Sequence, residues 1–230
     1  MAESARRASP VDPTHYPVSE EMPEPTLQRL VMEVLRPLIQ AWLDERGEVA
    51  FAGADQFIYW VQHQPTTRMA PDVYVLPGVP KGTDFGAWKV WETGVRPSIV
   101  IEIVGSDPRK DYEVAPGRYD EMGVEELVVF DPWHDAGSDR VRWQVWRRTA
   151  RGFVRVERTD GDRVRSQVLG CWLRLVGSGA DRRVRVATGP RGEVLLPTAE
   201  ERASAAEGRA SAAEAEAARL HLELESLKRR

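Results

Sequence analysis

The sequence predicts an α+β protein in which a mixed β-sheet is flanked by helices and followed by a β-meander and a helical tail. Three observations support this fold class. A helix, several strands, a second helix and a further strand follow one another up to about residue 132. Short strand-like runs then continue to about residue 196, and an alanine-rich heptad repeat occupies residues 198–230. The 230 residues are enough for one globular domain with extensions.

The N-terminal part of the chain is expected to hold a disordered arm and a long helix. Residues 1–25 contain five prolines and scattered acids, which predicts the arm. Thr26 suits the N-cap of a helix that runs to about Arg46, with apolar residues every three or four positions on one face. We expect Pro37 to kink or split this helix and Gly47 to end it.

Strand-like runs follow this helix. Residues 49–52 and 56–62 lie on either side of Asp55, and residues 72–76 come after a turn. This pattern suggests a hairpin that places Asp55 on the strand paired with that of Asp72. Glycines and prolines mark residues 77–97 as an irregular excursion.

The next elements form a strand–helix–strand unit. The apolar run at residues 98–104 predicts a strand, and a helix follows the loop at Asp107. Pro116 is tolerated near the first turn of this helix, and Gly123 is expected to end it. The apolar run at residues 127–130 then predicts a buried strand.

The rest of the chain divides into a meander and a tail. Short strands are expected between residues 141 and 196, which closes a domain spanning residues 26–196. In residues 198–230, alanines and leucines step by three and four alternately, as in the a/d seam of a coiled coil. Because alanine packs weakly, the seam is compatible both with a homodimeric coiled coil and with a solvated single helix.

Charge is distributed unevenly along the chain. The net charge of −4 excludes a protein that binds nucleic acid through overall basicity. Between residues 139 and 185, however, thirteen arginines stand against five acids. This excess permits a local phosphate-facing surface, and a solvated arginine face on the meander would produce the same pattern.

The composition also indicates a compartment. Cys171 is the only cysteine, so no internal disulfide can form and a reducing compartment is expected. The N-terminal residues lack the apolar core of a signal peptide, and no apolar stretch approaches the roughly 20 residues that span a bilayer. A soluble cytoplasmic protein is therefore expected.

Two acids interrupt apolar strands. Glu102 lies in the middle of the run at residues 98–104, and Asp72 begins the run at residues 72–76. A buried carboxylate is costly unless it is paired or binds a metal, and Mg²⁺ prefers oxygen ligands. Neighbouring strands would make the two acids a compact negative site. Alternatively, Asp72 caps a strand end and Glu102 faces solvent at a sheet edge.

An ordered set of motifs resembles the Uma-two family of restriction-endonuclease-like proteins, a branch of the PD-(D/E)XK nuclease superfamily. The set comprises Pro71-Asp72-Val73, residues 99–104 around Glu102, Arg109-Lys110-Asp111, Arg118-Tyr119 and the segment Gly-Val-Glu-Glu-Leu-Val-Val-Phe-Asp-Pro at residues 123–132. The resemblance covers about residues 25–175. It implies a restriction-endonuclease-like core in which acids at strand ends hold a divalent metal.

The resemblance assigns roles to particular residues. Asp72 corresponds to the metal-binding aspartate, and Glu102 to the first acid of the (D/E)XK element. The implied activity is a metal-dependent DNA endonuclease, a hydrolase in which a water activated by Mg²⁺ or Mn²⁺ cleaves a phosphodiester bond. Asp55 is a candidate third metal ligand, with a turn or strand-start aspartate as its alternative.

The chain departs from the family pattern at the lysine. The superfamily position two residues after the acid holds Val104, and the helical position four residues before Tyr119 holds Ala115. Lys110 and Arg118 are the candidate catalytic cations in its place, although Lys110 could also be a solvated loop residue. Arginine stabilises charge but cannot act as a base, because it stays protonated.

These departures leave a second function open. The chain could be a catalytically degenerate nuclease fold that acts as a binding or assembly module through its C-terminal helix. Relatives also carry a histidine about where Leu27 stands, and Gln28 is the nearest polar substitute. The sequence does not separate DNA from RNA as the substrate.

Overall fold

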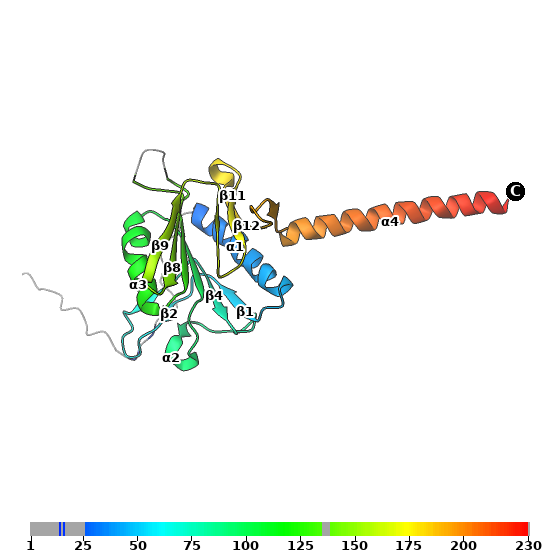
Figure 1. Ribbon diagram of the computed structural model, residues 1–230. Helices are drawn as coiled ribbons and strands as arrows, with labels where there is room; N and C mark the ends of the chain where they lie inside the picture. The colour runs from blue at the N-terminus through cyan, green and yellow to red at the C-terminus, as the bar shows by residue number, and fades with distance from the viewer. Residues whose placement is uncertain (1–13, 15, 17–25, 135–138, 230) are drawn as a thin grey trace, which may run out of the picture. The chain divides into compact units, whose positions relative to one another are not determined.

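The computed structural model describes residues 14, 16, 26–134 and 139–229. The arm expected at residues 1–25 therefore lies almost entirely outside the described residues. The chain divides into two compact units, one that ends at Leu195 and one that begins at Leu196. Figure 1 shows the elements of both units, which are described separately below.

The first helix, α1 (Thr26–Glu45), is a single helix that contains Pro37, so the expected split is wrong. Pro37 is exposed. The carbonyl that loses its hydrogen bond lies near this surface, where water can satisfy it. Leu35 and Ile39 are fully buried on the opposite face. Gly47 follows the helix in the left-handed region, with φ 67°, as expected.

The main sheet has six strands in the order β1-β4-β6-β7-β8-β9. Its only parallel pair is β6 with β7, and the remaining neighbours are antiparallel. This confirms the mixed sheet that the sequence predicts. The strands are β1 (Ala50–Gly53), β4 (Val73–Pro77), β6 (Ile99–Ile103), β7 (Glu126–Phe130), β8 (Trp143–Thr149) and β9 (Gly152–Thr159).

A helical crossover joins β6 to β7, because parallel neighbours cannot be connected by a tight turn. It begins with a π-helix, η1 (Lys110–Val114), and continues as α3 (Ala115–Met122). Pro116 lies in the first turn of α3, as expected. Gly123 ends the helix with φ 89°, where its N–H donates to the Tyr119 and Asp120 carbonyls.

The strand pairing around Asp55 differs from the expected hairpin. β4 pairs with β1, and only two of residues 56–62 form a strand, β2 (Ile58–Tyr59). β2 belongs to a three-stranded sheet with β3 (Arg68–Met69) and β5 (Trp88–Lys89), followed by the short α2 (Val90–Thr93). Asp55 lies in a bend with φ 51°, not on a strand.

One edge of the main sheet is closed by a side chain. The Gln40 amide of α1 donates from Nε2 to the Ala50 carbonyl at 3.2 Å. Its Oε1 accepts from the Ala52 N–H at 3.0 Å. Ala50 and Ala52 are two residues apart in β1, so both groups lie on the same edge of the strand. The glutamine therefore takes the place of a neighbouring strand.

The expected meander is divided between two sheets. β8 and β9 complete the main sheet, and the later strands form a four-stranded sheet in sequence order. These strands are β10 (Arg163–Arg165), β11 (Trp172–Val176), β12 (Arg183–Thr188) and β13 (Val194–Leu195). α1 contacts β12 as well as β1 and β4, so it packs between the two sheets (Figure 1).

Arginines of the basic stretch pair with buried acids. Arg140 donates to both oxygens of Asp131, at 2.6 and 2.7 Å, and Arg147 donates to Glu126 at 2.7 Å. Asp131 and Glu126 are fully buried. A buried carboxylate without a partner would strongly destabilise the fold. Some arginines of the basic stretch therefore stabilise the main sheet through ion pairs, and these arginines are not free to bind a phosphate.

The second unit consists mainly of α4 (Ala199–Lys228), which confirms the expected C-terminal helix. A capping box begins it: the Thr198 hydroxyl accepts from the Glu201 N–H at 3.1 Å, and the Glu201 carboxylate accepts from the Thr198 N–H at 2.7 Å. None of its described side chains is buried. Neither α4 nor any other described helix is long and apolar enough to cross a membrane.

Candidate active site

The pairing of β4 with β6 brings two predicted site residues together. Val73 faces Ile101 in this pair, so Asp72, just before β4, lies beside Glu102 in β6. The Ile103 N–H donates to Asp72 Oδ2 at 2.6 Å, and the Asp72 N–H donates to Glu102 Oε2 at 3.4 Å. Asp72 is 5% exposed and Glu102 is fully buried. The alternative of a solvent-facing Glu102 at a sheet edge is therefore wrong.

Neutral side chains from two helices hold the same carboxylates. Gln28 of α1 donates from Nε2 to Asp72 Oδ1 at 2.7 Å. The Tyr119 hydroxyl of α3 donates to Glu102 Oε1. Leu27, at the position of the family histidine, is buried instead. Each carboxylate thus accepts a hydrogen bond at both oxygens, which fixes its orientation.

The π-helix adds two charged residues to this site. The Ala115 N–H donates to the Lys110 carbonyl five residues back, and such π-turns are frequent at functional sites. Asp111 is 3% exposed and accepts a hydrogen bond from the Gly105 backbone. Lys110 is exposed, and among the described residues it forms no ion pair within 4.0 Å. Its charge nonetheless acts on the carboxylates, as their pKa shifts show.

Asp72, Glu102 and Asp111 form a carboxylate cluster, and burial is the largest cause of the pKa shift of each acid. It raises the pKa of Glu102 to about 7, against the opposing effects of the Lys110 charge and the Tyr119 hydroxyl. It also raises the pKa of Asp111 to about 7, with Lys110 again opposing the shift. The pKa of Asp72 is raised well above its ordinary value by burial and then by the negative charge of Glu102. The cluster therefore holds protons near neutral pH unless a cation replaces them.

The pKa values of Lys110 and Tyr119 are both raised, which keeps both side chains protonated at neutral pH. The charge of Glu102 is the largest contribution to the raised pKa of Lys110, so the ammonium stays protonated at neutral pH. Burial raises the pKa of Tyr119 well above its ordinary range, so the phenol remains a hydrogen-bond donor. The site therefore combines three acids with one permanent positive charge.

Two other predicted site residues have different surroundings. Asp55 is exposed, and its N–H donates to the Pro71 carbonyl at 2.9 Å, next to Asp72. Burial raises the pKa of Asp55 and the Lys110 charge lowers it, so Asp55 interacts electrostatically with Lys110. Arg118 instead pairs with Glu121 at 3.1 Å and lies 4.8 Å from the centre of the Trp60 ring. The structure does not bring Arg118 into contact with the two carboxylates.

The sequence interpretation did not assign Asp111, Tyr119 or Gln28 to the site. A signal for Asp111 was present, because residues 111, 115, 119 and 122 recur at helical spacing and all four are buried. An acid at the head of such an apolar stripe points inward. Gln28 was named only as the nearest polar substitute for the family histidine, and its contact with Asp72 depends on how α1 meets β4.

The donor set fits a hard divalent cation. Asp72 and Glu102 offer carboxylate oxygens from adjacent strands, and Mg²⁺ is commonly bound by one or two carboxylates together with waters and phosphate. In the part of the chain that the structure describes, no arginine pairs with either acid, whereas buried Glu126 and Asp131 each have one. Among the described residues, no group of three or more acid, histidine or cysteine side chains is arranged to hold a metal ion, so the candidate donors are these two carboxylates.

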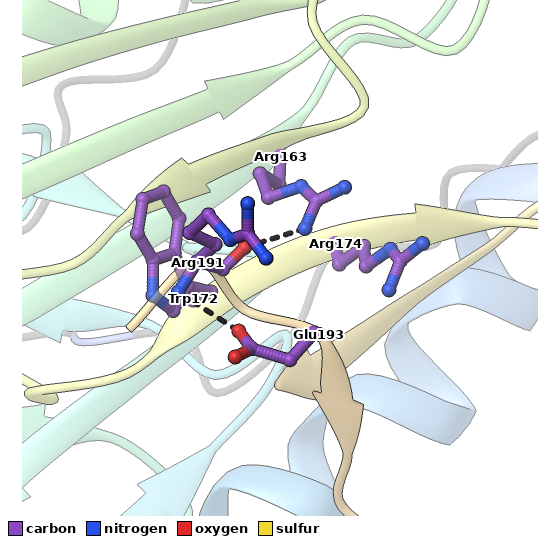
Figure 2. Close-up of a pocket in the computed structure, with 5 residues that line it drawn as sticks. All are labelled: Arg163, Trp172, Arg174, Arg191 and Glu193. Carbon is purple, nitrogen blue, oxygen red and sulfur yellow. Dashed lines mark hydrogen bonds between the residues drawn. The ribbon is translucent and has the colours of Figure 1, made fainter. Parts of the chain in front are cut away.

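A separate groove lies on the second sheet, with a volume of about 490 Å³. Figure 2 shows its lining residues, Arg163, Trp172, Arg174, Arg191 and Glu193. Arg163 donates to Asp162 and to the Arg191 carbonyl, and the Trp172 indole donates to the Gly189 carbonyl at 3.1 Å. These side chains brace the turn before β13, and none belongs to the carboxylate cluster.

Comparison with known proteins identifies the family of the chain. Residues 18–175 match the Uma2 family model, described as "Putative restriction endonuclease". A solved structure from Anabaena variabilis, titled "a putative nuclease belonging to DUF820", is 14% identical with a TM-score of 0.45. That match covers 65% of this chain and 78% of the other. No match was found among curated proteins. Because the family model spans well over half of the chain, the protein belongs to the Uma2 family.

Proposed function

We propose that the chain is a metal-dependent endonuclease that hydrolyses phosphodiester bonds in DNA. The observation that carries this proposal is the buried pair of Asp72 and Glu102, which neutral donors orient and no described arginine neutralises. The family description, "Putative restriction endonuclease", supports DNA as the substrate class. Mg²⁺ or Mn²⁺ suits the all-oxygen donor set.

Each residue of the site has a task in this proposal. A divalent ion, when bound, polarises the phosphoryl oxygen and makes hydroxide available near neutral pH. Asp72 and Glu102 would hold the cation and would release their protons as it binds, because burial raises the pKa of both acids. Gln28 and Tyr119 keep the two carboxylates in place.

Lys110 supplies the positive charge that the family pattern places elsewhere. Val104 and Ala115, at the two expected lysine positions, are both fully buried. Lys110 is one turn of the π-helix away from Ala115. The negative charges of Glu102, Asp111 and Asp72 raise its pKa. Since its pKa is raised, it acts by stabilising negative charge on the phosphate, not as a base. The absence of the family lysine therefore does not favour the degenerate, non-catalytic alternative.

A plasmid-nicking assay tests the proposed function. We expect the purified protein to convert supercoiled plasmid to open-circular or linear DNA with Mg²⁺ or Mn²⁺, and to leave it intact with a chelator. A single-stranded RNA of similar length should be a poorer substrate. Cleavage that persists in the chelator, or intact DNA with both metals across pH 6–9 (roughly the range around the site pKa values), would contradict the proposal.

Substitution of Lys110 tests the origin of the positive charge. We expect Lys110→Gln to lower the cleavage rate by about ten- to a hundredfold, in line with the loss of one electrostatic contact to a developing charge. Lys110→Arg should recover most of this loss, because charge and not basicity is required. The matched control is Lys81→Gln, which removes a lysine that pairs with Asp44 at the surface. Equal rates for Lys110→Gln and the control would remove Lys110 from the mechanism.

A further inference from the structure

α4 presents an apolar seam that nothing in its own unit covers. The eight seam residues are all exposed, and Leu220, Leu224 and Leu227 have exposures of 47%, 56% and 58%. Exposed leucines at a regular spacing on one side of a long helix are typical of a helix–helix interface. The seam residues are Ala203, Ala206, Ala210, Ala213, Ala217, Leu220, Leu224 and Leu227.

The charges beside the seam favour a second copy of the same helix as its partner. With Ala203 at position a, the g positions hold Arg202, Arg209, Glu216 and Glu223, and the e positions hold Glu207, Glu214, His221 and Lys228. In a parallel, in-register pair, each g residue faces the e residue five positions further along the other helix. The four facing pairs are Arg202–Glu207, Arg209–Glu214, Glu216–His221 and Glu223–Lys228. Three have opposite charges, and none has like charges.

An antiparallel pair would match these charges less well, although it brings Arg209 opposite Glu223. In that arrangement g residues face g residues and e residues face e residues. When the two seams overlap along their full length, Glu216 faces Glu216 of the other helix, and Glu214 faces Glu214. Both flanks would then bring like charges together at the centre of the interface, which is unfavourable.

We propose that α4 binds α4 of a second copy of this chain as a parallel, in-register two-stranded coiled coil. The alanine-rich first half lets the helices approach closely, and the three leucines of the last half supply most of the buried apolar surface. In a parallel arrangement, the first units of both copies are connected to the same end of the coiled coil. The proposal goes beyond the nuclease activity and does not depend on it.

Charge exchange on the full-length protein tests partner and orientation together. We expect Arg209→Glu to weaken dimerisation by about tenfold, because it replaces two opposite-charge pairs per dimer by two like-charge pairs. The double variant Arg209→Glu/Glu214→Arg should restore the dimer. Residues five apart do not face each other within one helix, so recovery reports a contact between helices. Sedimentation equilibrium over a range of protein concentrations measures each dissociation constant.

A second double variant separates the two orientations. Arg209→Glu/Glu223→Arg should not restore the dimer, because residues 209 and 223 face each other only in the antiparallel arrangement. Restoration by this variant in place of the first would overturn the parallel orientation. A protein that sediments as a monomer at all concentrations would overturn the interface itself.

Cysteine cross-linking gives an independent readout. Ala203→Cys lies on the seam and should form a disulfide-linked dimer under mild oxidation, since parallel register places the two copies of residue 203 side by side. Ala215→Cys lies on the outer side of the helix and is the control. The native Cys171 is buried and does not compete. Equal cross-linking at both positions, or none at residue 203, would contradict the proposal.

Discussion

Replacement of Glu102 by glutamine is expected to abolish metal-dependent cleavage, with a loss on the order of a thousandfold or more. Glutamine has the same shape, and its amide oxygen can still accept from the Tyr119 hydroxyl. It removes one of the two carboxylates that would hold the cation. Because burial raises the pKa of Glu102 to about 7, a neutral side chain already resembles its metal-free form, so the fold should keep its stability.

Glu126→Gln provides the matched control for this variant. Glu126 is equally buried, lies in the adjacent strand β7 and accepts from Arg147 at 2.7 Å. Its replacement leaves the arginine unpaired and should cost roughly 3 kcal/mol of unfolding free energy, while the folded protein still cuts. Cleavage rates and urea unfolding of both variants give the comparison. Wild-type cleavage by Glu102→Gln, or equal losses of activity in both, would remove Glu102 from the active site.

The metal-free protein is expected to lose stability as the pH rises from about 4 to about 7. The ordinary pKa values of the Glu102 and Asp111 side chains are 4.5 and 3.8, and burial raises the pKa of each to about 7 in the folded chain. Within this window the folded state binds more protons than the unfolded state. The stabilisation from these groups is therefore complete below about pH 4 and is lost through pH 7, with a change on the order of 3–4 kcal/mol for each group taken alone.

A divalent cation should reverse this trend, because it binds the charged carboxylates. We expect 10 mM Mg²⁺ (about a hundred times a typical weak dissociation constant) to raise the thermal midpoint clearly at pH 8 and little at pH 5. Thermal unfolding at both pH values, with and without Mg²⁺, gives the measurement. In Glu102→Gln the Mg²⁺ effect should shrink and the pH slope should flatten. A metal-free wild type that becomes more stable from pH 5 to pH 8 would contradict the raised pKa values.

The central part of the site was predictable from sequence because Glu102 interrupts an apolar strand. A charged residue among β-branched neighbours is visible without coordinates, and so is an acid at the start of the next apolar run. Asp111 was harder to recognise. Its helical spacing from residues 115, 119 and 122 indicated an inward direction, but the π-helix that carries it has no such signal in the sequence.

The strand pairing near Asp55 could not be read from local patterns. Residues 56–62 are aromatic and β-branched enough to predict a strand, yet β4 pairs with β1. That choice depends on tertiary contacts, including the Gln40 amide of α1 and the ring of Tyr74. Gly53 leaves room for this ring, because a Cβ there would collide with it. Such long-range contacts have no signature in a short window of sequence.

The amide of Gln40 also limits how copies of this sheet can aggregate. A growing stack of sheets needs two open edges in every copy, one to receive a neighbour and one to offer to the next. The glutamine occupies the Ala50 carbonyl and the Ala52 N–H of β1, which leaves β9 as the other edge strand of the main sheet. Addition of another copy at the β1 edge would therefore require the Gln40 side chain of α1 to leave these two groups.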